Sequence, residues 1–200
     1  MPTLGRPRGF DTDAALERAV EVFWRHGYEG ASLSDLTAAM GISRPSLYAA
    51  YGGKAQLFAK AVAHYAEHDM AYARSALEQP TAHDVVRVLL QGQLAALTRP
   101  DRPAGCLSIQ GGVAGGVGNA HVAELLAASR LAGEAALAQR LARAVDEGDL
   151  PAGTDPAALA RFVHVVQEGQ AVHAAAGVGR ELLEQSAALA LQVVPTAVPR

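Results

Sequence analysis

The amino-acid sequence predicts an all-α protein of about nine helices. Apolar residues recur at spacings of three and four along most of the 200-residue chain, which is the period of an amphipathic helix. Glycine-containing breaks separate these runs, and no segment of useful length alternates apolar with polar residues as a half-buried strand does. Half of the residues are apolar, so helices of this kind can bury a substantial core.

The first helix is predicted to begin after Asp11 and to stop at Gly27, because glycine commonly occupies the position just past a helix end. One face of this helix is apolar at helical spacing and is expected to pack inward. Its members are Leu16, Ala19, Val20, Phe23 and Trp24. The preceding residues 1–10 are rich in glycine, proline and arginine, and we expect a flexible basic arm there.

Two short helices follow, with a single glycine between them. Ser32 and Asp35 have the spacing of a capping box, so the second helix should run from about Leu33 to Met40 and end at Gly41. A helix of this length has no independent stability and must pack on its neighbours. Its exposed residues are therefore free for contact with a partner.

The third helix has its own start and stop signals. Ser43 is a suitable N-cap, and Pro45 is tolerated in the first turn, where backbone N–H groups have no intrahelical partner. Leu47 is expected to face the core, and Gly52-Gly53 should end the helix. A helix, a glycine turn and a second short helix form the helix-turn-helix arrangement, in which the second helix enters a DNA major groove.

A long fourth helix is expected from Lys54 to about Glu78, with one inward-facing stripe. The stripe consists of Leu57, Ala61, Tyr65, His68 and Tyr72. Five further alanine-rich helices complete the prediction. They are expected at about residues 82–98, 105–117, 120–147, 156–176 and 179–194.

Charge and cysteine content narrow the class of protein. Residues 1–60 hold seven Lys and Arg against six Asp and Glu, whereas the rest of the chain holds ten arginines against fourteen acids. Only the first part therefore has any electrostatic case for a polyanionic partner.

A single cysteine, Cys106, excludes an intramolecular disulfide. No apolar run has the length of a membrane span or a signal-peptide core, so we expect a cytoplasmic protein without a membrane partner.

The polar residues of the third helix suit contact with DNA. Arg44 can bind guanine or phosphate, and Ser46 can hydrogen-bond to either. Tyr48 offers its hydroxyl to phosphate and its ring to a thymine methyl group. Lys54 lies where its ammonium group and the N–H groups that open the fourth helix both favour phosphate. The alternative is an ordinary helical hairpin with a solvated polar face, because the periodicity alone is permissive.

The segment "GYEGASLSDLTAAMGISRPSLYAAYGGKAQLF" resembles the amino-terminal domain of TetR-family transcriptional regulators. The resemblance covers about residues 10–60 and implies an all-α homodimer that binds palindromic double-stranded operator DNA. It implies a helix-turn-helix domain at residues 11–56 and a larger ligand-binding and dimerisation domain at residues 57–200. Ala50 stands where many family members carry histidine, so one common contact is missing. The DNA contacts implied by the resemblance are Ser32, Thr37, Arg44, Pro45, Ser46, Tyr48 and Lys54.

The amino-terminal arm is a further candidate for DNA contact. Arg6 and Arg8, in the segment GRPRG, can enter a minor groove, which is narrow and negative over A·T tracts. The alternative is a solvated terminus without a partner.

The resemblance also implies a ligand pocket in the larger domain. Cys106 lies in a segment that resembles the family's regulators of aldehyde, electrophile and copper responses, so it is a candidate reactive sensor; the alternative is a small buried hydrophobe. His64 and His68 have a spacing of four residues that can hold a metal, but no cysteine cluster or carboxylate motif accompanies them. We therefore expect no metal and no cofactor. The polar and aromatic residues expected in the pocket are His64, His68, Tyr72, Phe162, Gln170 and His173.

We therefore expect a ligand-responsive DNA-binding transcriptional regulator, a repressor that an unknown small molecule releases from its operator. The fourth helix starts at Lys54 and ends near the expected pocket, so its tilt can couple the two sites. The alternative is a regulator that senses electrophiles or redox state through Cys106. A DNA-binding architectural protein without a ligand is a further alternative. No catalytic or cofactor motif supports an enzyme.

Overall fold

The computed structural model describes residues 10–113 and 119–196, and within these ranges the chain forms ten α-helices and no strand. The all-α prediction is confirmed, with one helix more than expected. The helices are α1 Thr12–Gly30, α2 Leu33–Met40, α3 Arg44–Tyr51, α4 Lys54–His68, α5 Ala71–Leu77, α6 Ala82–Leu97, α7 Leu107–Val113, α8 Ala120–Asp146, α9 Pro156–Ala175 and α10 Arg180–Gln192.

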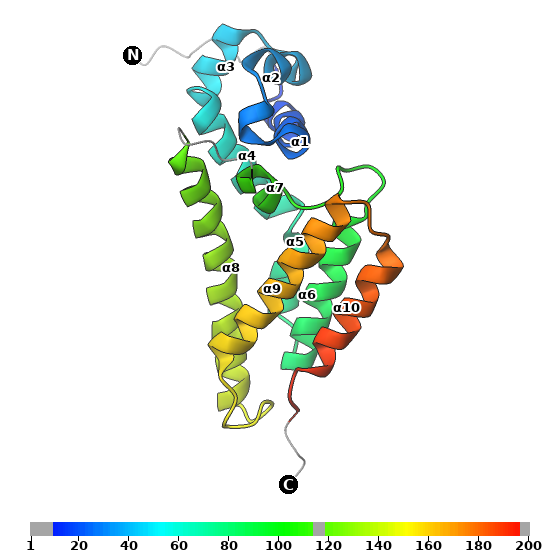
Figure 1. Ribbon diagram of the computed structural model, residues 1–200. Coiled ribbons are helices and arrows are strands. Elements are labelled where there is room, and N and C mark those ends of the chain that lie inside the picture. The colour runs from blue at the N-terminus through cyan, green and yellow to red at the C-terminus, as the bar shows by residue number, and fades with distance from the viewer. Residues whose placement is uncertain (1–9, 114–118, 197–200) are drawn as a thin grey trace, which may run out of the picture.

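The helices divide into a small amino-terminal group and a larger group. Helices α1, α2 and α3 cluster at one end of the molecule, and α4 leads from that cluster toward the larger group (Figure 1). The long helix α8 runs along one side, whereas α6, α9 and α10 pack side by side on the other (Figure 1). Helix α7 packs against α1 and α8, so it lies between the two groups.

Helix α1 extends past its predicted end. Its N-cap Asp11 accepts hydrogen bonds from the N–H groups of Asp13 and Ala14 at 2.9 and 3.1 Å. Gly27 has a φ of 65°, outside the helical region, but the helix resumes after it and reaches Gly30. The glycine therefore makes a kink where a stop was predicted, since the left-handed conformation is accessible to glycine at little cost.

The limits of α2 and α3 agree with the prediction. The Ser32 side chain accepts the Asp35 N–H at 3.1 Å, while the Asp35 carboxylate accepts the Ser32 N–H, which completes the capping box. Gly41 and Gly52 take left-handed conformations, with φ of 67° and 86°, and end the two helices. These local signals determine where both helices begin and end.

The predicted fourth helix is wrong in its length. Helix α4 ends at His68, and α5 begins at Ala71 after a turn at Asp69 and Met70. The backbone N–H groups of both turn residues donate to the Tyr65 carbonyl, at 2.9 and 3.1 Å. Neither glycine nor proline marks this turn. The Asp69 side chain is buried and pairs with arginines from the segment after α6, a contact that helical periodicity cannot reveal.

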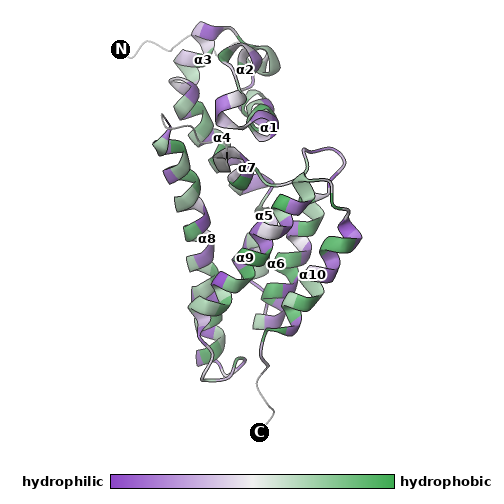
Figure 2. Ribbon diagram, in the orientation of Figure 1, coloured by the Kyte–Doolittle hydropathy of each residue, from purple (hydrophilic) through white to green (hydrophobic). Residues whose placement is uncertain are grey.

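The other helices begin and end within two residues of their predicted limits, apart from the end of α7. That end was predicted at residue 117, which lies outside the described residues. Figure 2 shows hydrophobic and hydrophilic residues interspersed along the helices, as expected for helices with one buried and one exposed face. Among the described residues, no helix is both long enough and apolar enough to cross a membrane.

Aromatic side chains fix α4 against α1. The Phe23 ring packs edge-on against Phe58 with a centroid separation of 4.9 Å, and Tyr28 packs on the same Phe58 ring at 5.1 Å. Phe23 and Phe58 are both fully buried. Because rings in this geometry contribute beyond their buried area, α1 and α4 form a firm unit beneath the helix-turn-helix.

Candidate nucleic-acid interface and internal cavity

Helix α3 presents one buried face and one exposed face. Leu47 and Tyr51 are buried, and the Tyr51 hydroxyl donates to the Thr12 carbonyl at 2.8 Å, which anchors α3 to the start of α1. On the other face Arg44 is exposed and half of the Tyr48 surface is accessible. An arginine and a tyrosine on one exposed face can contact base edges and phosphates together.

The predicted contact residues near the helix starts have internal hydrogen bonds. The Ser32 hydroxyl donates to Asp35 at 2.6 Å, and this bond lowers the pKa of the Asp35 carboxyl group. The Thr37 hydroxyl donates to the Leu33 carbonyl at 2.9 Å. The hydroxyl groups of Ser43 and Ser46 share a hydrogen bond of 2.8 Å. The hydroxyl oxygens can still accept hydrogen bonds, but donation to phosphate requires these protons to turn.

Pro45 and Lys54 complete the described part of the predicted interface. Pro45 is exposed in the first turn of α3. Lys54 begins α4 after Gly53, and this helix start has no side-chain cap. The Lys54 Nζ lies 4.5 Å from the centroid of the Tyr28 ring. An uncapped helix start with an adjacent cation is suited to bind a phosphate. The predicted contacts Arg6 and Arg8 lie outside the described residues.

A cavity of about 80 Å³, partly open to solvent, lies in the larger domain. Tyr72 and Cys106, both predicted as pocket residues, line it. Other lining residues are apolar side chains such as Met70 and Leu97. Since a dry apolar cavity of about 150 Å³ holds benzene, this cavity fits only a small molecule unless its walls move. The polar residues that line it and that sequence reasoning missed are Tyr65, Gln93, Ser108, Ser129, Arg130, His164, Gln167 and Glu168.

The other five predicted pocket residues do not line this cavity. His64 Nε2 lies 2.7 Å from a Glu17 carboxylate oxygen, and the exposed His68 stacks on the His64 ring at 4.1 Å. Phe162 is on the surface of α9. Gln170 and His173 instead line a groove against α10, where the Gln170 amide donates to the Leu183 carbonyl at 3.2 Å. These five residues are therefore divided among three places outside the cavity.

One buried polar atom of a residue that lines the cavity has no hydrogen-bond partner within the described structure. Gln93 donates its amide to the Gln167 carbonyl at 2.8 Å, but its Oε1 is unpaired. Burial lowers the pKa of the His164 imidazole, which also lines the cavity and interacts with the Ala160 backbone. Because an unpaired buried polar atom is costly, Gln93 Oε1 is a natural partner for a bound molecule.

Cys106 is buried and immediately precedes α7. Its sulfur accepts a hydrogen bond from the Tyr65 hydroxyl at 3.4 Å, and burial raises the pKa of that phenol. Arg99 and Arg102, the cations near it in sequence, instead pair with carboxylates. Within the described residues, the Cys106 sulfur forms no hydrogen bond with a cation, and no group of three or more His, Cys, Asp or Glu has a metal-binding arrangement.

The exposed face of α3, the capped α2 behind it and the lysine that opens α4 define a helix-turn-helix DNA-binding protein. Comparisons with known proteins specify its family. A family model for "Bacterial regulatory proteins, tetR family" matches residues 15–61, and one for a "Tetracyclin repressor-like, C-terminal domain" matches residues 82–189. The second match alone spans more than half of the chain. The protein belongs to the TetR family of bacterial transcriptional regulators.

Individual relatives span nearly all of the chain. The HTH-type transcriptional repressor ComR of Escherichia coli (strain K12) is 32% identical over 196 residues, which cover 97% of this chain and 93% of ComR. The uncharacterized HTH-type transcriptional regulator YezE of Bacillus subtilis (strain 168) is 37% identical over 163 residues, covering 80% and 84% of the two chains. A cysteine mutant of the TetR family regulator CifR, complexed with 26-bp operator DNA, is 42% identical with a TM-score of 0.91, covering 96% and 100%.

Proposed function

We propose that this protein is a transcriptional repressor that binds a palindromic operator as a homodimer and is released by a small molecule. One observation carries the proposal: α4 joins the two sites. The helix begins at Lys54, beside the exposed face of α3, and Tyr65 near its other end lines the cavity. A ligand that displaces Tyr65 can therefore change the orientation of the DNA-contact residues. Similarity to the repressor ComR supports this direction of regulation.

Dimerisation is proposed through α9 and α10. Both helices carry large apolar side chains that are exposed in the single chain, and on each helix these follow helical spacing. Burying them between two copies would remove this apolar surface from water and place two helix-turn-helix units on two half-sites. The residues concerned are Phe162, Val165, Val172, Leu182, Leu189 and Val193.

The effector is proposed to occupy the cavity next to Tyr65 and Tyr72. A cavity with an unpaired polar atom in its wall favours this proposal over an architectural DNA-binding protein, for which a sealed core is expected. Sensing of electrophiles through Cys106 is the second candidate, and it is favoured by the presence of the thiol in the cavity wall. The burial of Cys106, and a sulfur that forms no hydrogen bond with a cation among the described residues, weigh against it.

The test is a selection from genomic DNA. The purified protein is mixed with sheared DNA of its host, and the retained fragments are sequenced. We expect one or a few palindromic sites, because two symmetric recognition helices require two symmetric half-sites. Diffuse retention without a motif would contradict the proposed function. A palindromic site beside a transport or enzyme gene would also narrow the chemical class of the effector.

A further inference from the structure

The segment between α6 and α7 carries a largely buried arginine that contacts three carboxylates. Arg102 Nε lies 3.3 Å from Asp69 Oδ1, and its Nη1 lies 3.4 Å from Glu21 Oε1. Its Nη2 donates to Glu17 Oε1. The Arg102 side chain is only 13% exposed and that of Asp69 only 3%. Such a planar cation with several donors is suited to hold carboxylates from different elements together.

These carboxylates belong to the two parts of the protein that a repressor must couple. Glu17 and Glu21 lie four residues apart on α1, which supports the helix-turn-helix. Asp69 lies at the turn where α4 ends and the larger domain continues. Without Arg102, two carboxylates on α1 would face a third, and within the described residues only the contact of Glu17 with His64 would still join them to the larger domain.

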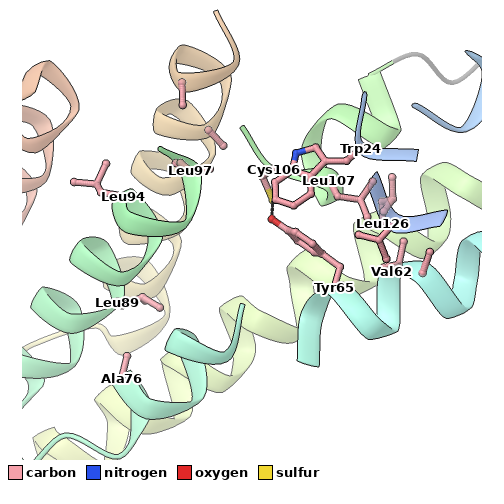
Figure 3. Close-up of a cluster of buried hydrophobic side chains, with 14 of the residues drawn as sticks. Trp24, Val62, Tyr65, Ala76, Leu89, Leu94, Leu97, Cys106, Leu107 and Leu126 are labelled. Atoms are coloured by element: carbon pink, nitrogen blue, oxygen red, sulfur yellow. Dashed lines mark hydrogen bonds between the residues drawn. The ribbon is translucent and has the colours of Figure 1, made fainter. Parts of the chain in front are cut away.

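The same segment forms part of the cavity wall at both of its ends. Leu97, the last residue of α6, and Cys106, which precedes α7, both line the cavity. Figure 3 shows Leu97, Cys106 and Tyr65 in one buried cluster, with Trp24 of α1 beside them. The Trp24 ring packs edge-on against Tyr65 at 4.8 Å. Displacement of either end of the segment by a bound molecule would therefore act on Arg102, which lies midway.

The arrangement of the two domains resembles that of a relative bound to DNA. The CifR mutant in complex with operator DNA matches 96% of this chain with a TM-score of 0.91, so both domains superimpose together. The contacts of Arg102 thus occur in a chain whose overall conformation is close to a DNA-bound one. They are expected to stabilise that conformation and to be broken in the released one.

We infer that Arg102 is a positioning residue that locks α1 to the larger domain in the operator-binding conformation, and that the effector acts by withdrawing this arginine from Glu17 and Glu21. The inference rests on the proposed function, whose regulation it specifies. The effector can shift the equilibrium between the operator-binding and the released conformation only by its differential affinity for the two. The strength of the contacts between Arg102 and α1 therefore also sets how tightly an effector must bind to release the operator.

The experiment compares Arg102→Gln with Arg99→Gln in the full-length protein, on the operator obtained by genomic selection. Arg99 is a matched control, since it lies in the same segment and pairs with Asp69 at 3.6 Å and with Asp101 at 2.6 Å, but it forms no ion pair with α1 within the described structure. We expect Arg102→Gln to weaken operator binding about tenfold or more, within the usual range of coupling between sites, and Arg99→Gln to change it about twofold at most. Arg102→Lys keeps the positive charge but lacks the planar guanidinium group, so it should bind the operator more tightly than Arg102→Gln and less tightly than the unmodified protein.

A merely structural role is separated by measurements on the folded dimer. Thermal unfolding and sedimentation give the fraction of each variant that is folded and dimeric. The affinity for the operator is then calculated from the concentration of that fraction. The emission of Trp24, the single tryptophan, should shift in Arg102→Gln and not in Arg99→Gln, because Trp24 lies on α1 and only Arg102 pairs with carboxylates of that helix. If Arg102→Gln does not fold, Glu17→Gln provides the test, since Glu17 is partly exposed and its carboxylate contacts only Arg102 and His64 among the described residues.

The inference is overturned if Arg102→Gln binds the operator as tightly as the unmodified protein, or if its loss of binding is fully explained by unfolding. Combining Arg102→Gln with Glu17→Gln should cost less than the sum of the two single losses, because both changes remove the contact between Arg102 and Glu17. Additive losses would mean that the two side chains act separately and would also overturn it. Failure of the unmodified protein to select any operator is a different result, and it contradicts the proposed function itself.

Discussion

The Tyr65 hydroxyl donates a hydrogen bond to the Cys106 sulfur at 3.4 Å, and this contact joins α4 to the segment that leads into α7 (Figure 3). Both side chains are buried and both line the cavity. The helix that carries Lys54 at its start is thereby tied to the cavity wall near its end. A ligand that separates this pair would act on α4 directly.

Removal of the Tyr65 hydroxyl should lower stability modestly. Tyr65→Phe keeps the ring that packs on Trp24 but leaves no donor for the sulfur, and we expect a loss of about 1 kcal/mol or less, because sulfur is a weak acceptor. Urea unfolding at fixed protein concentration measures the change. Cys106→Ser is the matched control, since its oxygen can accept the same hydrogen bond. Equal stability of Tyr65→Phe and the unmodified protein would mean that the hydrogen bond contributes nothing.

Substitution on the exposed face of α3 should weaken operator binding without affecting the fold. Arg44→Ala and Tyr48→Ala are each expected to cost about 1–3 kcal/mol of operator binding, because each removes a base or phosphate contact. Fluorescence anisotropy on the selected operator measures the loss. Arg143→Ala, at an exposed position near the end of α8, is the control and should bind normally. Loss of the folded dimer in the α3 variants would show that these side chains support the core.

The helix-turn-helix was predictable because its signals are local. Ser32 with Asp35 starts α2, Gly41 ends it, and Ser43 starts α3, all within a few residues of one another. The turn at Asp69 was not predictable in this way, because its buried carboxylate pairs with Arg102, which lies far along the chain. Tertiary ion pairing overrides the helical period at that point.

The pocket was predictable only in part, for the same reason. Extending the inward stripe of α4 past Tyr65 placed His68 inside, but the helix ends there and His68 is exposed. Tyr72 reaches the cavity from α5 instead, and a Cβ on the facing Gly92 would lie 2.7 Å from the Cβ of Tyr72. Gln93 and Gln167 meet across two helices that are distant in sequence. Gln93, a polar residue within the apolar pattern of α6, was a local indication of this site in the sequence.

Introduction of a charge on α10 should break the proposed dimer. Leu189 is 64% exposed in the single chain, and Leu189→Glu would place a carboxylate in the interface. We expect dimer affinity to fall by at least about 100-fold, which corresponds to about 3 kcal/mol. Leu131→Glu on α8 is a matched control, because Leu131 is also 64% exposed but lies outside the proposed interface. Analytical ultracentrifugation that found both variants dimeric would exclude α10 from the interface.

Acidification should destabilise the protein partly through His164. Burial lowers the pKa of this imidazole below its usual value of 6.5, so the folded state resists protonation. Below about pH 6.5 the unfolded chain binds a proton that the folded protein does not, and the free energy of unfolding falls as the pH decreases through this window. The loss should level off once the pH is below the folded-state pKa. His164→Gln removes the titrating group and should reduce the loss measured between about pH 7.5 and about pH 5.5.

The control for this pH effect is His83→Gln, since His83 is exposed on α6. Because this side chain is exposed, we expect His83→Gln to change the acid-induced loss of stability less than His164→Gln does. Other buried groups, including His64, whose pKa burial also lowers, are present in all three proteins, so the difference isolates His164. Urea unfolding at both pH values, with protein concentration fixed to keep dimerisation constant, gives the comparison. The same acid-induced loss in His164→Gln and the unmodified protein would mean that the imidazole is accessible to protons in the folded state.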